Sequence, residues 1–472
     1  MHFVSLDFLV FCGLFFALWK FLKPNVQVRW LLLTTASFIF YGWWNWHFLL
    51  LIVASGLIDF LAALGIQRYP TYRKFLLILS LASNLSSLAV FKYLAFFITS
   101  TNSLATSVGY DVGIPLVSLT LPVGISFYTF QSMSYTIDVY RGKLEPTRNV
   151  LHFFAYLSMV PQLVAGPIVR ASDLLPSLRE VHVPSSEQRW AGFRLICFGY
   201  FKKMVIADQF APAVNSVFSA PVMTTSSPVL WTIMIMFAIQ IYCDFSGYTD
   251  IARGLAKWMG YDFPVNFNRP YEAVSMQDFW RRWHISLSSW FRDYVYFPLG
   301  GSRGSEFKAH QNAWITMLLS GLWHGAAWTF IAWGAVHAAC LSFERVTDWP
   351  RKLSAWRGGT ILCRVVTFLL VLVGWVFFRA ETFTQAVSAL ATMVQFNTEH
   401  LDELSKTVGQ SAFDILLLTL AYGLMRSLST AQTFERFRVP LLHRLEPVGV
   451  AVIITSTVFL RGPGHSFVYF QF

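Results

Sequence analysis

Charged residues are scarce in this sequence. Only 13% of the 472 residues are Asp, Glu, Lys or Arg, whereas a soluble domain carries about one-quarter charged residues. Hydrophobic residues make up 55%, and the mean hydropathy is +0.51. So little polar surface cannot cover a water-soluble globule of this size, which excludes an ordinary soluble enzyme and a disordered chain. The composition therefore predicts an all-α polytopic membrane protein.

Cysteine is scarce as well. The five cysteines are scattered in or beside apolar runs, and none belongs to a C-x-x-C motif. This pattern argues against a disulfide framework and against a zinc site, so we expect buried thiols and no metal centre. The chain also lacks H-E-x-x-H, the motif of zinc hydrolases.

The formal net charge is +11, but the sequence contains no run of Lys and Arg long enough for a nucleic-acid patch. Within the first 150 residues, the loops after the first, third and fifth apolar runs carry Lys and Arg. The loops that begin at Trp43 and Ser100 carry neither. Cytoplasmic loops are enriched in Lys and Arg, so this alternation predicts an N-terminus outside the cytoplasm and basic loops that face anionic lipid.

Apolar runs long enough to cross a bilayer recur along the chain and predict about 10–12 transmembrane helices in a single domain, residues 1–472. The run at 312–344 is either one long helix or two broken ones. Residues 169–227 and 246–311 mix aromatic side chains with Arg and Ser, which predicts interfacial or re-entrant helices around a central cavity. The runs are 5–22, 29–44, 46–66, 75–99, 113–131, 150–168, 228–245, 312–344, 361–378, 412–427 and 446–460.

His324 lies in the segment LSGLWHGAAWTF, where no Asp, Glu, Lys or Arg occurs between Lys308 and Glu344. A neutral imidazole can take a proton from an alcohol, as acyl transfer to a hydroxyl requires. Glycines at 321 and 325 would let a substrate approach the backbone. A packing histidine and a functional one both remain open, although an imidazole retained in hydrocarbon favours function.

His284 lies in DFWRRWHISLSSWFRDYVYFPLGG, residues 278–301. As one helix, this segment would place Trp283, Trp290 and Tyr294 on one face, which predicts an amphipathic interfacial helix with an aromatic belt. His284 has no histidine at i+4, so it is not expected to bind a metal. The basic residues of this segment bind either lipid phosphates or the phosphates of a coenzyme. They are Arg281, Arg282 and Arg292.

Two further polar clusters interrupt apolar runs. QIYCDFSGYTDIARG, residues 240–254, is expected to form a structural network in which Asp250 and Arg253 pair, with a cavity wall as the alternative. QSMSYTIDVYRG and VPQLVAGPIVR hold Asp138 and Arg170 beside helix-breaking Pro and Gly, which indicates a kink that lines the cavity. His337 lies 13 positions after His324, on the far side of a shared helix, so we expect it to serve packing.

Together these segments resemble the membrane-bound O-acyltransferase family. The sequence WHG at His324 is similar to the family's central histidine motif, and WRRWHISLSSWFRDYVYFPLGG at His284 is similar to its second histidine motif. The two polar clusters and the sequence VYFQF are similar to those of the bacterial polysaccharide branch, whose members act on alginate, cellulose and other exopolysaccharides.

The resemblance implies a ring of transmembrane helices around a central funnel, with His324 at a thin floor in its middle. It also implies that an acetyl group leaves a cytoplasmic thioester donor, here acetyl-CoA, and crosses the bacterial inner membrane. A periplasmic partner of the SGNH acetyltransferase type then delivers the group to a polysaccharide acceptor. The N-terminus would face the periplasm.

In that scheme His324 and His284 are the catalytic residues. His324 acts as a general base or briefly carries the acyl group, and His284 lines the cytoplasmic funnel and orients the donor. Arg281, Arg282 and Arg292 would hold the coenzyme phosphates. Three alternatives stay open: D-alanyl transfer to teichoic acid from a carrier-protein thioester, transport of a polysaccharide or lipid-linked sugar, and a scaffold subunit whose partners do the chemistry.

Overall fold

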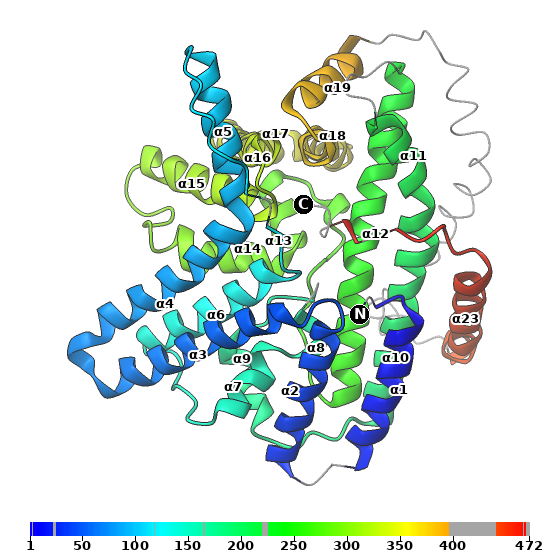
Figure 1. The fold of residues 1–472 in the computed structure, drawn as a ribbon. Coiled ribbons are helices and arrows are strands. Elements are labelled where there is room, and N and C mark those ends of the chain that lie inside the picture. The colour runs from blue at the N-terminus through cyan, green and yellow to red at the C-terminus, as the bar shows by residue number, and fades with distance from the viewer. Residues whose placement is uncertain are drawn as a thin grey trace.

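A computed structural model describes residues 1–472 with the exception of residues 2, 22–24, 118, 164–165, 220–224, 396–439, 466 and 469–472. These described residues form helices and connecting segments and contain no strand. The prediction of an all-helical membrane protein is confirmed. Figure 1 shows the long helix α12 alongside α10 and α11, with the N-terminal helices α3, α4 and α6 and the helices α15 to α18 to the left of it in this view.

The helices differ widely in length, and several are interrupted. Three π-helical segments continue the helices that precede them. They are η2 (Ala89–Tyr93, five residues), η3 (Phe201–Ala207, seven residues) and η5 (Arg292–Tyr296, five residues). The α-helices are α1 (Leu6–Phe21), α2 (Val26–Gly42), α3 (His47–Arg68), α4 (Arg73–Leu88), α5 (Leu94–Ser107), α6 (Ile125–Tyr140), α7 (Val150–Leu157), α8 (Val160–Leu163), α9 (Ala171–Leu178), α10 (Ser186–Tyr200), α11 (Asp208–Phe218), α12 (Ser227–Met259), α13 (Met276–Arg282), α14 (Ile285–Phe291), α15 (Glu306–His324), α16 (Trp328–Thr347), α17 (Trp349–Ser354), α18 (Gly359–Arg379), α19 (Phe383–Gln395) and α23 (Pro440–Phe459).

Fewer helices than expected are long enough to span a membrane. By length and hydropathy, four qualify in the described part of the chain: His47–Arg68, Pro70–Ser107, Ser227–Met259 and Gly359–Arg379. The remaining apolar runs of the described residues fall on helices that are too short, too polar or broken to meet both criteria. The run expected at 150–168 is split between α7 and α8. The run expected at 446–460 lies within α23, and the run expected at 412–427 lies outside the described residues.

Helices α3, α4 and α6 pack together in the N-terminal group (Figure 1). The buried carboxylate of Asp59 on α3 joins them by accepting hydrogen bonds from Ser80 and Asn84 of α4 and from Ser132 of α6. Buried polar groups inside a membrane domain are stable only when such partners are present. The network therefore explains how a carboxylate is retained between apolar helices.

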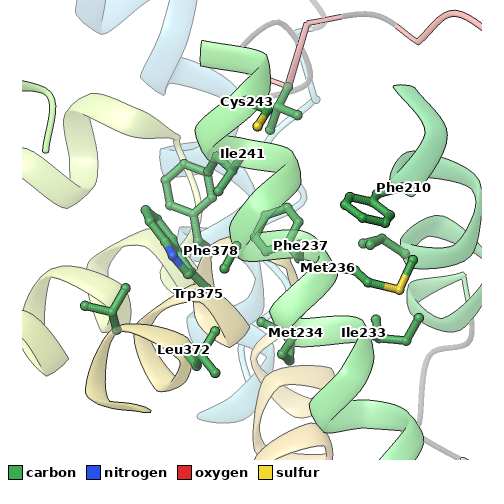
Figure 2. Packing of buried hydrophobic residues seen from close by; sticks show 14 of the residues in the cluster. Phe210, Ile233, Met234, Met236, Phe237, Ile241, Cys243, Leu372, Trp375 and Phe378 are labelled. Carbon is green, nitrogen blue, oxygen red and sulfur yellow. The ribbon is translucent and has the colours of Figure 1, made fainter. Parts of the chain in front are cut away.

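Helix α12 packs directly against α10 because small residues face one another. A Cβ atom on Gly199 would lie 2.6 Å from the carbonyl oxygen of Gly247, and one on Gly254 would lie 2.5 Å from that of Gly192. These distances are too short for any side chain, so glycine allows the two backbones to touch. On its other faces α12 packs against α11 and α18. Figure 2 shows Met236 and Phe237 of α12 between Phe210 of α11 and Trp375 of α18.

The 312–344 run forms a hairpin of two helices, α15 and α16. The chain breaks at Gly325, which adopts an extended conformation (φ −160°, ψ 153°) that caps α15. A Cβ atom on Gly321 would lie 2.2 Å from the carbonyl oxygen of Phe330, and one on Gly334 would lie 2.5 Å from that of Met317. Glycine at these positions therefore lets the two helices pack closely.

A polar slot beside η3 and α12 holds the segment that follows α23. The N–H of Gly462 donates to the carbonyl oxygen of Met204 at 2.7 Å. A Cβ atom on Gly462 would lie 2.5 Å from the carbonyl carbon of Asp208, so only glycine fits there. The aromatic ring of Phe467 is fully buried and lies 4.5 Å from that of Tyr248 on α12.

Lys203 forms the centre of this slot and is only 1% exposed. Its ammonium lies 2.7 Å from Asp208 Oδ1 and 2.9 Å from Asp244 Oδ1, and donates to the carbonyl oxygen of His465 at 3.0 Å. The N–H of Val468 donates to Asp244 Oδ2 at 2.7 Å. Two carboxylates thus compensate the lysine and also bind the backbone of the C-terminal segment.

Candidate active site

His324 is the last residue of α15 and is 4% exposed. Aromatic rings enclose its imidazole: the centroids of Trp323 and Trp333 lie 5.0 Å away, and that of Phe378 on α18 lies 5.4 Å away. Such a wall excludes water and lowers the local dielectric, which strengthens electrostatic interactions with a bound substrate. The imidazole thus lies in a dry, apolar enclosure.

The glycines beside His324 serve packing. A Cβ atom on Gly325 would lie 2.0 Å from the aromatic ring of Phe330, and Gly321 is in contact with the backbone of the same residue. The expectation that these glycines let a substrate approach the backbone is therefore wrong. The hairpin partner α16 already occupies that space.

Lys92 and Tyr93 of η2 hold the end of α15. The ammonium of Lys92 donates to the carbonyl oxygens of Trp323 at 2.5 Å and His324 at 3.2 Å. The hydroxyl of Tyr93 donates to the carbonyl oxygen of Leu322 at 2.8 Å. The last carbonyls of a helix have no partner within the helix and carry partial negative charge. The π-helical segment therefore supplies the C-terminal cap of the helix that ends at His324.

His284 lies at a sharp break between α13 and α14 and is fully buried. Its backbone is left-handed (φ 42°, ψ 54°), which is strained for a residue other than glycine and is frequent at functional sites. Asn266 holds the start of α14 by accepting from Ser286 N–H and Oγ–H at 3.1 and 2.9 Å. Within the described part of the chain, neither ring nitrogen of His284 has a hydrogen-bond partner.

Trp323 connects the two histidines. Its ring centroid lies 5.9 Å from that of His284 and 5.0 Å from that of His324. On its opposite side, His284 contacts Phe245 of α12 at 4.6 Å. The structure thus brings both sequence-predicted histidines to one aromatic cluster.

The segment 278–301 is broken and does not form the expected single amphipathic helix. It consists of α13, α14 and the π-helical segment η5. Trp283 and Trp290 are buried against the domain interior and do not form a belt at the lipid surface. The left-handed break at His284 changes the direction of the chain, so the helical periodicity does not continue across it.

A cavity of about 970 Å³ opens between α13, α14, η5, α15, α16 and α17. Four arginines line it: Arg281 and Arg292, which were predicted from the sequence, together with Arg345 and Arg351. Thr316 and Ser320 of α15 line it as well, and Ser320 lies one helical turn before His324. Two acidic residues, Glu344 and Asp348, line it too, so the lining has an excess of basic residues and includes the helix that carries His324.

Sequence comparison places this arrangement in a family. The chain is 39% identical to the probable alginate O-acetylase AlgI of Pseudomonas aeruginosa over 436 residues, which cover 90% of this chain and 80% of the relative. It belongs to the membrane-bound O-acyltransferase family. The family's sequence profile matches residues 147–380, a range that contains both histidines and the cavity.

Two other relatives show the breadth of this similarity. AlgI of Azotobacter vinelandii is 41% identical over 422 residues, covering 88% of this chain and 81% of the relative. The peptidoglycan O-acetyltransferase of Helicobacter pylori is 36% identical over 416 residues, covering 82% and 77%. This O-acyltransferase is therefore a multi-pass membrane enzyme related to bacterial proteins named for O-acetylation.

The predicted arginines of the O-acyltransferase differ in their pairing. Arg282 does not line the cavity, and its guanidinium is paired with Asp278 at 2.8 Å. Arg281 is exposed and donates to the neutral side chain of Gln277 at 3.2 Å. Arg281 and Arg292 thus line the cavity and Arg282 does not, and phosphate binding by these arginines stays a prediction.

Asp293 connects Arg292 to a second basic residue. Arg292 lies 2.7 Å from one carboxylate oxygen of Asp293, and Arg170 lies 2.5 Å from the other. Burial alone would raise the pKa of Asp293, but the hydrogen bonds and positive charges of the two guanidinium groups lower it below its ordinary value. One carboxylate is thus shared by two arginines, and this part of the surface stays positively charged.

The other polar clusters of the O-acyltransferase are structural. Asp250 pairs with Arg253 at 3.6 Å, as expected, and with Lys202 at 2.6 Å. Asp138 accepts from the hydroxyl of Tyr294 at 2.7 Å. None of these residues lines the cavity of the described chain.

His337 does not share a helix with His324, because the break at Gly325 places it on α16. Its ring contacts Trp333 at 4.7 Å and Trp280 at 5.1 Å. It therefore packs in the same aromatic cluster as His324, whereas an uninterrupted helix would have placed it on the far side. The described residues contain no group of three or more His, Cys, Asp or Glu that could hold a metal ion.

Sequence reasoning missed Lys92, which lies before the range matched by the family profile. A signal for it was present, because Lys92 is the only charged residue between Lys74 and Asp111. A lone charge inside a spanning run is a functional hypothesis by default.

Proposed function

We propose that this O-acyltransferase takes an acetyl group from acetyl-CoA at the cytoplasmic face of a bacterial inner membrane and passes it outward for O-acetylation of a cell-envelope polysaccharide such as alginate or cellulose. In this proposal a periplasmic acetyltransferase of the SGNH type completes the delivery. The observation that carries it is the arginine-lined cavity, which includes Ser320 one turn before His324. The names of the relatives support polysaccharide acetylation.

The lining of the cavity suits a phosphorylated donor. Guanidinium groups bind phosphate oxygens through two parallel hydrogen bonds. Within the described part of the chain, Arg281 and Arg345 have no carboxylate within 4 Å, and Arg351 lies 3.6 Å from Asp348. Arg281, Arg292, Arg345 and Arg351 would bind the phosphates of the coenzyme. The pantetheine arm would then extend along α15 past Thr316 and Ser320.

His324 would act on the acceptor hydroxyl. Its neutral imidazole accepts the proton while the hydroxyl oxygen bonds to the thioester carbonyl carbon. The carbon–sulfur bond then breaks, and the thiolate leaves with the electron pair and takes the proton back from the imidazolium. In the covalent variant, the imidazole nitrogen attacks the carbonyl carbon first, the carbon–sulfur bond breaks, and the thiolate leaves with the electron pair and takes the imidazole proton. The acceptor hydroxyl oxygen then attacks the acetyl carbon, the carbon–nitrogen bond breaks, and the imidazole takes the hydroxyl proton. His284 would orient this site through Trp323.

The test uses purified protein in liposomes with radiolabelled acetyl-CoA supplied at the cytoplasmic face. Wild type is compared with His324→Ala and with the control His47→Ala, which changes an exposed histidine at the start of α3. We expect donor turnover to fall at least about 100-fold in His324→Ala, and to persist in His47→Ala, with unchanged thermal unfolding in both.

Equal turnover in wild type and His324→Ala would move the chemistry away from His324. A wild-type protein that is inert with acetyl-CoA and active with a D-alanyl carrier-protein thioester would replace the proposed donor. Movement of polysaccharide without any acyl turnover would identify a transporter instead.

A further inference from the structure

Lys92 lies in the middle of Pro70–Ser107, the longest of the described helices that could span a membrane. A charged side chain at that depth is costly and is retained where it has partners or a function. Lys92 belongs to η2, the π-helical segment between α4 and α5. Single-turn π-helical segments redirect side chains and are frequent at functional sites.

The contacts of Lys92 converge on the end of α15. Its ammonium donates to the carbonyl oxygens of Trp323 and His324 and lies 3.4 Å from the hydroxyl oxygen of Ser126 on α6. An ammonium has three N–H donors, so these three oxygens use all of them. The ammonium also lies 5.9 Å from the ring centroid of Trp323, over the aromatic wall between the two histidines.

No carboxylate in the described residues lies within 4 Å of Lys92. Its partners are backbone carbonyls, which carry only the partial negative charge of a helix C-terminus, and one neutral hydroxyl. The positive charge beside His324 is therefore incompletely compensated. In a low-dielectric site, such a charge acts strongly on negative charge that develops nearby.

We propose that Lys92 is a positioning residue for acyl transfer at His324, a role that rests on the proposed function. It holds the last turn of α15 and supplies the positive field toward the reacting carbonyl. When the acceptor oxygen adds to the thioester carbon, the carbonyl oxygen becomes negative until the carbon–sulfur bond breaks and the thiolate leaves. Lys92 stabilises both anions through the field and keeps its own protons throughout.

A purely structural cap would explain the hydrogen bonds without any role for charge. Tyr93 provides the comparison, because its hydroxyl holds the same turn through Leu322 without a charge. Tyr93→Phe therefore removes a cap hydrogen bond, and Lys92→Gln removes the charge while keeping an amide donor. Comparing the two variants therefore separates the effect of losing a hydrogen bond at the last turn of α15 from the effect of losing the positive charge.

The experiment measures kcat and KM for acetyl-CoA in liposomes, together with thermal unfolding, for Lys92→Gln, Lys92→Met, Lys92→Arg and Tyr93→Phe. Lys257→Met is the control, because Lys257 pairs with Asp262 at the end of α12. We expect both neutral variants to lower kcat about tenfold or more with an unchanged KM. Lys92→Arg restores part of kcat, and Tyr93→Phe and Lys257→Met stay within about threefold of wild type.

Three results would overturn the inference. They are wild-type kcat in Lys92→Gln, an equal loss in Tyr93→Phe, and failure of both neutral variants to fold, which would mark Lys92 as a structural cation. His324→Ala is measured in the same series. If wild type does not turn over acetyl-CoA, the proposed function fails, and if His324→Ala retains turnover, the chemistry lies away from His324. If His324→Ala loses turnover while Lys92→Gln does not, only the role of Lys92 fails.

Discussion

Lys92 and Lys203 both lie inside the helical domain, but they differ in whether carboxylates surround the ammonium group. Lys203 is buried between Asp208 and Asp244, whereas Lys92 has carbonyl and hydroxyl oxygens as its partners. Lys203 therefore has two carboxylate partners, and Lys92 has none within 4 Å among the described residues. The compensated lysine anchors a chain segment, and the uncompensated one lies beside His324.

The same contrast holds at the cavity. Arg282 pairs with Asp278 and lies outside the lining, whereas Arg281 has a neutral partner and lies within it. Burying a charge costs free energy that a counter-charge in good geometry offsets. Between the neighbours Arg281 and Arg282, the arginine without a counter-charge is thus the better candidate for binding an anion. Arg292 lines the cavity as well, although it shares the carboxylate of Asp293 with Arg170.

The largest effect is expected at the compensated site. Lys203→Met leaves two carboxylates buried without their cation, so the free energy of unfolding should fall by about 3–5 kcal/mol. Thermal unfolding in detergent measures this change. Adding Asp208→Asn and Asp244→Asn should recover much of the loss, because the uncompensated charges are then gone. A single Lys203→Met variant with wild-type stability would contradict the difference drawn between the two lysines.

A smaller effect is expected at the cavity. Arg281→Gln should raise the KM for acetyl-CoA about tenfold, because a charge-assisted hydrogen bond to phosphate is lost. Arg282→Gln is the matched control on the same helix turn and should change KM less than about twofold, since its partner is Asp278. Steady-state kinetics in liposomes measures the KM of both variants. Equal effects of both substitutions would show that pairing does not separate binding arginines from structural ones.

The smallest effect is expected at Asp293, where one carboxylate is shared by Arg170 and Arg292. Its pKa is lowered in the folded protein. The carboxylate therefore contributes stability above its unfolded pKa, and this contribution is lost as the pH falls through the folded pKa. Wild type should exceed Asp293→Asn in stability by less than about 1 kcal/mol at pH 7. The difference should shrink below about pH 4; a constant difference from pH 7 to pH 3 would contradict it.

Sequence reasoning predicted the helical membrane fold and the two histidine motifs because both depend on local patterns. Long apolar runs report burial in lipid, and WHG and RRWHISLS stand out as polar groups within them. The pairing of Arg282 with Asp278 follows from i,i+4 spacing on α13. That pair could have been read from the sequence, and it would have separated Arg282 from Arg281.

Other features depended on breaks and long-range contacts that no local pattern contains. The left-handed backbone at His284 ends the helical periodicity from which the aromatic belt was inferred. The extended Gly325 moves His337 to a second helix. The contact of Lys92 with the end of α15 joins residues that are 231 and 232 positions apart. Its lone charge was visible in the sequence, but its partners were not.

The ribosome synthesises Lys203 long before His465, which lies 262 positions later in the chain. During synthesis, Lys203, Asp208 and Asp244 therefore enter the membrane without the backbone groups of His465 and Val468 that later bind them. Until His465 and Val468 dock, these buried side chains lack three of their hydrogen bonds. The hydrogen bonding of this part of the interior is therefore completed by the last residues to be synthesised.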